Sequence, residues 1–366
     1  MQLRAPETVE LTLDSIDSRV AAVSQAPAVF LLWPHAGAPY LAKTSRLGQR
    51  LARLLGARDR PSRFLNLRGI AGRLEYWLTG SSLEQSLISY ELARRHFPDD
   101  YGRRLRLRSP SYVKLILTNA FPRTQVTSRL GGGNLHYGPF PTRAAAERFE
   151  NTFLDLYQLR RCQEDLDPSP AHPGCIYGEM GKCLRPCQQV VTVEEYAGET
   201  HRVEEFLASS GRSLLDSVKS ARDRLSEEMD FEGAARQHQR FQQAEEVLKL
   251  AGDLARDVRN LHGVAVTRSA APDAVELWFL RSGSWLAPQR IDLRDQVSLD
   301  HRLREAVSKP EGEPLSARTK HEHMALLVRW YHSSWRDGEW LVMDSPVAAP
   351  YRRLVNAVHR VAARIS

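Results

Sequence analysis

The fold of this chain is decided by the segment Gly181-Lys182-Cys183-Leu184-Arg185-Pro186-Cys187, which completes a run of four cysteines. The run begins at Cys162 and Cys175, and 12, 7 and 3 residues separate its successive members. The 366 residues contain no other cysteine, and Met1 to Glu10 lacks the apolar stretch of a secretory signal. We therefore expect a cytoplasmic protein whose clustered thiols bind metal rather than form disulfides. Thiolates suit both Zn²⁺ and an iron-sulfur cluster, and four unrelated buried cysteines are the remaining alternative.

The charge is unevenly distributed along the chain. The net charge is +7, yet residues 43–73 hold nine Lys or Arg against one acid, and residues 94–129 hold nine against two. A basic front and an acidic remainder indicate a polyanionic partner, DNA or RNA, although a solvated basic face is also compatible. With 26% charged and 42% hydrophobic residues the composition is globular and excludes a fibrous or disordered chain. No apolar stretch approaches the roughly 18 residues of a membrane span, so we expect no membrane partner.

Hydrophobic patterning predicts an α+β protein of several domains. Strands are expected at 28–33, 39–42, 113–117, 125–127, 263–266, 275–280, 285–291 and 340–343, and helices at 45–55, 82–96, 213–250 (a pair broken near Asp230) and 324–331. Thr44 or Ser45 is expected to cap the first helix, and residues 165–174 are expected to form a loop. The predicted domains are a leader (1–24), a first domain (25–125), a Cys-rich segment (126–200), a helical hairpin (205–250) and a small α/β unit (255–366).

Three stretches resemble the middle of UvrC, the nuclease subunit of bacterial nucleotide excision repair. They are Tyr137-Gly138-Pro139-Phe140-Pro141, Leu159-Arg160-Arg161-Cys162 and the segment 181–187. The resemblance implies that Cys162, Cys175, Cys183 and Cys187 ligate a 4Fe-4S cluster, with zinc as the alternative. In length the chain is similar to the short UvrC homologues called Cho, and we expect no complete RNase H-like nuclease domain.

The helical hairpin carries a second resemblance. Phe231-Glu232-Gly233-Ala234-Ala235-Arg236 is similar to the UVR motif, through which UvrC docks on a matching hairpin of UvrB. The resemblance implies a UvrB-like partner bound by Phe231, Ala234 and Ala235. His238-Gln239 stands where an Arg-Asp pair normally follows. A hairpin that packs only within its own chain is the alternative.

Residues 27–55 resemble the GIY-YIG nuclease module, which implies a small mixed sheet with helices. The pattern places its second tyrosine at Tyr40, its lysine at Lys43 and its arginine at Arg50, so these are the candidate catalytic residues. Phe30 occupies the position of the first tyrosine and lacks the hydroxyl that could relay a proton.

The metal position of this module departs from the family pattern. The metal-binding glutamate aligns with Ser89 and the asparagine with Tyr101. On a helix Glu91 lies about 200° and Glu84 about 140° from Ser89, so neither shares its face. Serine is a poor sole anchor for Mg²⁺. We therefore expect hydrolysis to be lost or severely reduced, with Mg²⁺ or Mn²⁺ bound only if the site is active.

The basic front supplies the candidate DNA contacts, which are Arg46, Arg53, Arg94, Arg95, Arg103, Arg104, Arg106 and Arg108. The leading interpretation is a UvrC/Cho-like DNA-binding repair protein that acts with UvrB and has a degenerate nuclease site. One alternative is an active metal-dependent endonuclease that makes the 3′-side incision beside a lesion. The other is a zinc-containing RNA-binding protein.

Overall fold

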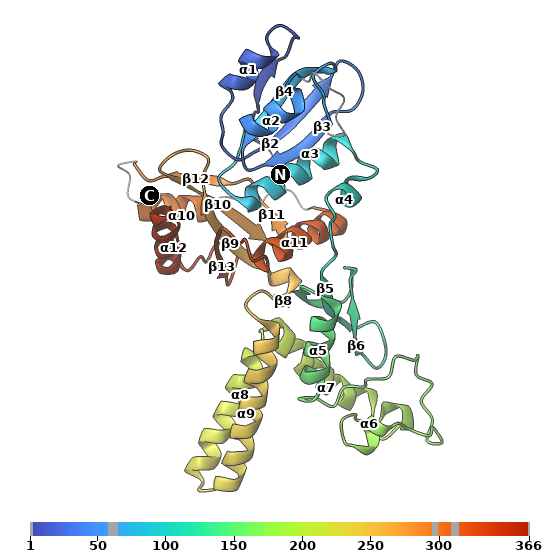
Figure 1. Ribbon diagram of the computed structural model, residues 1–366. Helices are drawn as coiled ribbons and strands as arrows, with labels where there is room; N and C mark the ends of the chain where they lie inside the picture. Colours follow the sequence, from blue (N-terminus) through green and yellow to red (C-terminus); the bar gives the residue numbers. More distant parts are fainter. Residues whose placement is uncertain (1–2, 58–64, 295–298, 309–314, 365–366) are drawn as a thin grey trace.

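The computed structural model describes residues 3–57, 65–294, 299–308 and 315–364. Within these ranges the chain forms three small antiparallel sheets, each covered by helices, and a long helical hairpin that projects from the middle of the molecule (Figure 1). No helix in the described ranges combines the length and the apolar character that crossing a membrane requires. The α+β class is confirmed.

The first domain contains a sheet of order β1-β4-β2-β3, made of β1 (Glu7–Glu10), β4 (Ala71–Leu78), β2 (Ala28–Pro34) and β3 (Tyr40–Thr44). Its helices are α1 (Ile16–Ala22), α2 (Leu47–Leu55), α3 (Ser82–His96) and α4 (Tyr101–Arg104). The expected strands and helices are confirmed, and the apolar run of β2 is buried because it is a central strand.

Three expectations about this domain are wrong. The sheet is antiparallel throughout rather than mixed. Residues assigned to a leader supply β1, which pairs with β4, and α1, which packs against α2. No side chain caps α2, because the Thr44 hydroxyl instead accepts a bond from the Arg46 N–H ahead of the helix.

The middle domain has a sheet of order β6-β5-β7-β8. Its strands are β5 (Ser111–Ile116), β6 (Arg123–Thr127), β7 (Leu135–Phe140) and β8 (Arg256–Asp257), and its helices are α5 (Arg143–Leu154), α6 (Ile176–Glu179), η1 (Pro186–Gln188) and α7 (Val193–Ala208). An aromatic stack joins sheet to helix, with ring centroids 5.0 Å apart for Tyr137–Phe149 and 5.7 Å apart for Phe149–Phe153. The two predicted strands 113–117 and 125–127 are confirmed as β5 and β6.

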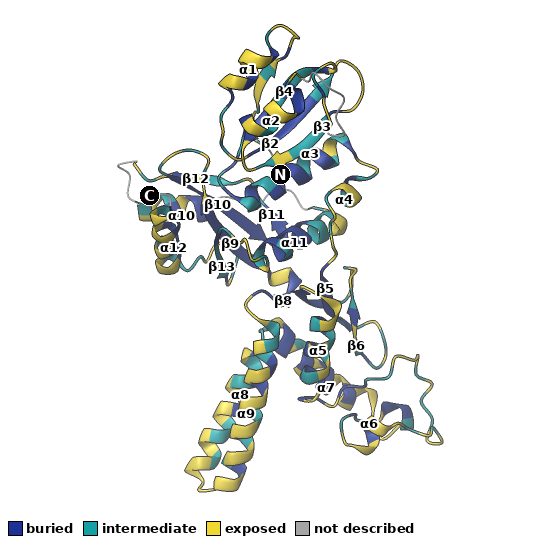
Figure 2. Ribbon diagram, viewed as in Figure 1, coloured by how far each residue is buried: buried dark blue, intermediate teal, exposed yellow. Residues whose placement is uncertain are grey.

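The predicted helical pair is confirmed as α8 (Arg212–Glu227) and α9 (Phe231–Ala251). The base of this hairpin belongs to the middle-domain core, where Leu214, Val218, Ala244 and Val247 are buried. Its far half is exposed to solvent on most sides (Figure 2). The chain then returns to the middle sheet through β8 before it enters the last domain.

The C-terminal domain has strand order β11-β10-β9-β13, and β12 also pairs with β10. Its elements are η2 (Val258–Asn260), β9 (His262–Arg268), β10 (Ala274–Arg281), β11 (Ser284–Trp285), β12 (Gln289–Asp292), α10 (Leu299–Ser308), α11 (Ala317–Tyr331), β13 (Gly338–Met343) and α12 (Tyr351–Ala363). Both faces of its sheet are covered, with α10 and α12 on one face and α11 on the other. The expected strand 285–291 is two short strands.

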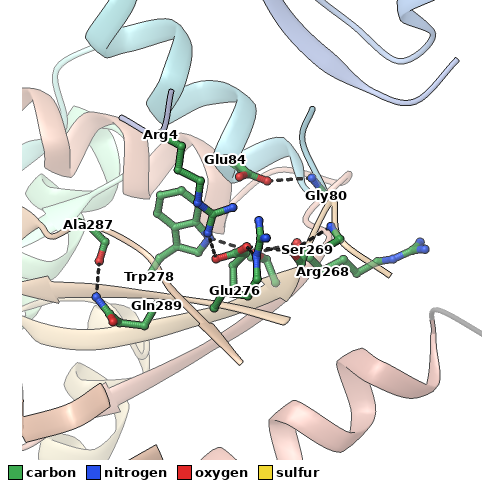
Figure 3. A network of polar contacts seen from close by, with 12 residues as sticks. Arg4, Gly80, Glu84, Arg268, Ser269, Glu276, Trp278, Ala287 and Gln289 are labelled. Atoms are coloured by element: carbon green, nitrogen blue, oxygen red, sulfur yellow. Dashed lines mark hydrogen bonds and ion pairs between the residues drawn. The ribbon is translucent and has the colours of Figure 1, made fainter. Parts of the chain in front are cut away.

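Helix α3 joins the first and last domains, because it is buried on two sides. Ile88 and Leu92 pack against β2, whereas Leu83 and Leu87 belong to the core shared with α11. Beside this joint, the fully buried Glu276 is ion-paired with Arg4 at 2.6 Å and with Arg290 at 2.9 Å (Figure 3). The two domains therefore meet across both an apolar and a charged contact.

Candidate functional site

Two of the nuclease-like residues, Tyr40 and Lys43, lie on the edge strand β3, on opposite faces, whereas Arg50 lies on α2 and Phe30 on β2. Tyr40 faces α2, where its hydroxyl accepts a hydrogen bond from Arg50 Nη2 at 3.1 Å and its ring lies 6.2 Å from that of Phe30. Lys43 pairs with Val29 of β2, whose side chain belongs to the core on the α3 side. The structure thus brings Tyr40, Arg50 and Phe30 together and places Lys43 on the opposite face.

Lys43 lies near a second cation from another domain. Desolvation and the charge of Arg329, on α11, lower the pKa of Lys43 below its ordinary value. The Arg329 guanidinium donates to the Leu105 carbonyl at 2.9 Å, which fixes its place against the first domain. Two cations held near each other favour an anion between them.

Ser89 lies on the side of α3 that faces β3. Gln85, one turn earlier, donates from Nε2 to the Thr44 carbonyl of β3 at 3.2 Å, and residues four apart share a helix face. Ser89 itself is buried. The nearby carboxylates point elsewhere, since Glu84 accepts from the Gly80 N–H at 2.8 Å and Glu91 lies 3.8 Å from Arg94. These contacts agree with the angles expected from helical periodicity.

A carboxylate from the C-terminal domain reaches this region instead. Glu322 of α11 accepts hydrogen bonds from the hydroxyls of Tyr90 and Tyr101, both at 2.7 Å, and from Arg318 Nε at 3.1 Å. Burial raises the pKa of Glu322, but these three donors outweigh burial and hold the pKa below its ordinary value. Tyr101, at the asparagine position, is therefore a partner of Glu322. Sequence reasoning missed Glu322, because no local signal connects residues 221 positions apart.

The candidate DNA-binding arginines differ in their availability. Arg94 contacts Glu91, and Arg103 and Arg104 pair with Asp100 at 3.5 and 2.7 Å. The remaining members of the set are exposed, namely Arg46, Arg53, Arg95, Arg106 and Arg108. The basic front is therefore partly neutralised within the chain.

The four cysteines do not form a ligand set in this structure. Among the described residues, no group of three or more His, Cys, Asp or Glu side chains is arranged to hold a metal ion. The geometry accordingly does not support the expected iron-sulfur cluster, and it does not support a nuclease metal site. Cys175 is exposed and Cys162 half-buried, whereas Cys183 and Cys187 are buried. All four are free thiols in the structure.

The thiols nevertheless influence one another. Burial raises the pKa of Cys183 to about 11, a hydrogen bond from the Arg185 N–H lowers it in part, and the other three thiols raise it further. Burial and the neighbouring Cys162 and Cys175 also raise the pKa of Cys187. The neutral thiol form is therefore favoured, and metal binding would require these groups to lose protons.

Three basic residues near the cysteines, Arg160, Arg161 and Lys182, bond within the chain. Arg160 is buried and donates to the carbonyls of Phe121 at 2.8 Å and Glu164 at 2.9 Å, and to Cys162 Sγ at 3.4 Å. Asp155 accepts from both Arg161 and Lys182. These cations therefore hold the Cys-rich loop in place.

The tip of the helical hairpin presents the UVR-like residues to solvent. Phe231 is 69% exposed and follows Asp230, whose side chain caps α9 by accepting from the Gly233 N–H at 2.9 Å. Ala235 is exposed and Ala234 half-buried. Only the base of the hairpin packs into the chain, so the tip is available to another molecule.

Comparison with known proteins defines the class. Residues 112–208 match the family model for the middle domain of the UvrC/Cho excinucleases. Residues 112–208 are therefore similar to the middle domain of the UvrC/Cho excinucleases, and the chain is similar to UvrC proteins over most of its length.

Three curated relatives share the name UvrABC system protein C. The protein of Lachnospira eligens is 24% identical over 260 residues, covering 70% of this chain and 42% of that protein. The protein of Desulfatibacillum aliphaticivorans is 23% identical over 332 residues (87% and 54%), and that of Symbiobacterium thermophilum is 26% identical over 248 residues (67% and 39%). The chain thus spans about half or less of the relatives it matches. No solved structure matches.

Proposed function

We propose that this chain is a DNA-binding protein of nucleotide excision repair whose GIY-YIG-like site does not cut DNA. The observation that carries the proposal is Ser89, on the face of α3 that looks toward β3, where the family resemblance implies a metal-binding glutamate. A hydroxyl cannot replace the carboxylate that Mg²⁺ prefers, and Glu84 and Glu91 are engaged elsewhere. In this proposal Lys43 and the exposed arginines contact phosphate groups.

The partner in this proposal is a UvrB-like protein bound by the hairpin tip. The exposed Phe231 supports it, because an aromatic side chain left in water at a helix start is suited to a hydrophobic contact. The relatives carry the name UvrABC system protein C, which is consistent with such a partnership.

An active endonuclease making the 3′-side incision is the second candidate. It is favoured by the Arg50–Tyr40 hydrogen bond, which keeps a hydroxyl and a cation together as a phosphodiester-cleaving site needs. In this alternative Mg²⁺ or Mn²⁺ would polarise the phosphoryl group.

A gel assay on lesion-containing plasmid, with and without UvrB and with Mg²⁺ or Mn²⁺, separates the two. We expect retarded DNA and no nicks. Nicking that disappears in Tyr40→Phe but persists in the matched control Tyr351→Phe, on the distant α12, would refute the inactive-site proposal.

The proposal also includes a metal cofactor bound by the four cysteines. The family resemblance supports Cys162, Cys175, Cys183 and Cys187, all within the matched residues 112–208, as ligands of a 4Fe-4S cluster, with zinc as the alternative. Visible absorption of anaerobically purified protein distinguishes them, because an iron-sulfur protein is brown and a zinc protein is colourless. A colourless, zinc-containing protein that prefers RNA would favour the RNA-binding alternative.

A further inference from the structure

A cavity of about 650 Å³ lies where the middle domain meets the C-terminal domain, and neither β3 nor the Cys-rich loop contributes to its lining. Its walls come from the loop Gly131–Gly133, from β7, from residues around η2 and from the start of α11. The volume falls within the range of about 300–1,000 Å³ that is usual for small-molecule and nucleotide sites.

One wall carries a buried polar group without a partner. His136 of β7 is 6% exposed, and its Nε2 atom has no hydrogen-bond partner among the described residues. The Nε2 atom is closed off from solvent, so only the part of the ring that lines the cavity is open to a ligand. Burial, together with the charge of the cross-strand neighbour Lys114, lowers the pKa of His136, and its imidazole is therefore neutral at pH 7. A neutral imidazole ring at the cavity wall can stack against a nucleobase.

The opposite wall favours an anion. Lys320 of α11 has no carboxylate partner among the described residues, whereas Arg259 and the buried Asp257 neutralise each other at 2.7 Å. Ala317 is the first residue of the 15-residue α11 and also lines the cavity, so a helix N-terminus faces the same space. The surplus charge is therefore positive.

The glycine loop lets a ligand approach the backbone closely. A Cβ atom added at Gly131 or Gly132 would meet nothing within 4 Å. Asn134 holds the loop, because its Nδ2 donates to the Gly132 carbonyl at 3.0 Å and its Oδ1 accepts from the Leu117 N–H at 3.2 Å. The loop is thus open on the cavity side and anchored from within.

We propose that this cavity binds one nucleotide of a single DNA strand, with its phosphate near Lys320 and the first turn of α11 and its base against His136. A paired and stacked nucleotide of a duplex cannot enter a pocket, whereas an unpaired one can. The inference rests on the proposed DNA-binding function and adds to it a preference for single-stranded segments.

Fluorescence anisotropy of the full chain tests the cavity. The probes are a labelled oligothymidine of about 15 nucleotides, its duplex form, and thymidine monophosphate as competitor. We expect Lys320→Glu and Gly132→Glu to weaken single-strand binding about tenfold, the loss typical of one charge-assisted contact, and to weaken duplex binding less. Lys219→Glu, on the exposed face of α8, matches the charge change and should retain wild-type affinity.

Lys320→Ala should also reduce the salt dependence of single-strand binding, by about 0.7 in the slope of log K against log salt. Wild-type affinity in both glutamate variants would overturn the proposal that the cavity binds DNA, while leaving the DNA-binding function intact. Failure of the wild-type chain to bind either form of DNA would overturn the proposed function itself. Competition by thymidine monophosphate as strong as that by the oligonucleotide would assign the site to a free nucleotide and overturn the single-strand inference.

Discussion

Replacement of Glu84 by glutamine is expected to stabilise the protein at pH 8 much more than at pH 5. Glu84 is 3% exposed in the joint between the first and last domains (Figure 3). Burial raises the pKa of Glu84 to about 7, the Gly80 N–H lowers it in part, and the charge of Glu276 raises it further. The glutamine oxygen can still accept the bond from Gly80, so the variant removes the charge and retains the contact.

The sign follows from the direction of the shift. A carboxyl whose folded-state pKa lies above its unfolded value of 4.5 destabilises the fold when it ionises, so stability is lost as the pH rises from 4.5 through 7. Between pH 5 and pH 8 the loss is about 2.5 kcal/mol at most, and the glutamine variant should not show it. Since 1 kcal/mol moves a melting temperature by roughly 2–4 °C in domains of 150–250 residues, a gain of about 5 °C is expected at pH 8.

Thermal unfolding of both proteins across this pH range provides the measurement. Glu232→Gln on α9 is the matched control, because that side chain is 93% exposed and its ionisation stays in water. Wild-type and Glu84→Gln curves that run parallel from pH 5 to pH 8 would refute the reasoning.

Three other substitutions test separate parts of the chain. Tyr196→Phe removes a buried hydroxyl that donates to the Pro122 carbonyl at 2.8 Å and accepts from the Arg160 N–H at 2.9 Å, so urea unfolding should show a loss of about 1–3 kcal/mol; unchanged stability would contradict this. Phe231→Ala should change stability by less than about 0.5 kcal/mol yet abolish co-purification with UvrB, and undiminished co-purification would exclude the tip as the docking site. Cys183→Ser should remove the visible absorption of the anaerobic protein, and an unaltered spectrum would show that this thiol is not a ligand.

Elements with a strong local pattern were predictable from the sequence. Their hydrophobic pattern or stop signal lies within a few consecutive turns or residues. Examples are the apolar run of β2, the helix ended by Pro98 and the helical hairpin. β1 and α1 were missed, because β1 is exposed on most of its length and is held by pairing with β4, about 65 residues away. The expected mixed sheet was also wrong, because whether neighbouring strands run parallel or antiparallel depends on partners that are distant in the sequence.

The candidate site was predictable only where one helix decides it. Helical periodicity correctly separated Ser89 from Glu84 and Glu91. It could not reveal that β3 places Tyr40 and Lys43 on opposite faces, because that depends on which neighbours cover the strand. Glu322 reaches Tyr101 only through the packing of two domains. The cysteine spacing indicated a family resemblance, but it did not predict that the described residues contain no arranged ligand set.

The helical hairpin follows α7 at one end and continues into the middle sheet through β8 at the other. Its base is rooted in the middle-domain core, its tip is free, and its returning end continues through β8 into η2, which lines the cavity at the domain boundary. A partner bound at the tip would therefore hold one end of an arm whose backbone continues directly to Arg259 at the domain boundary.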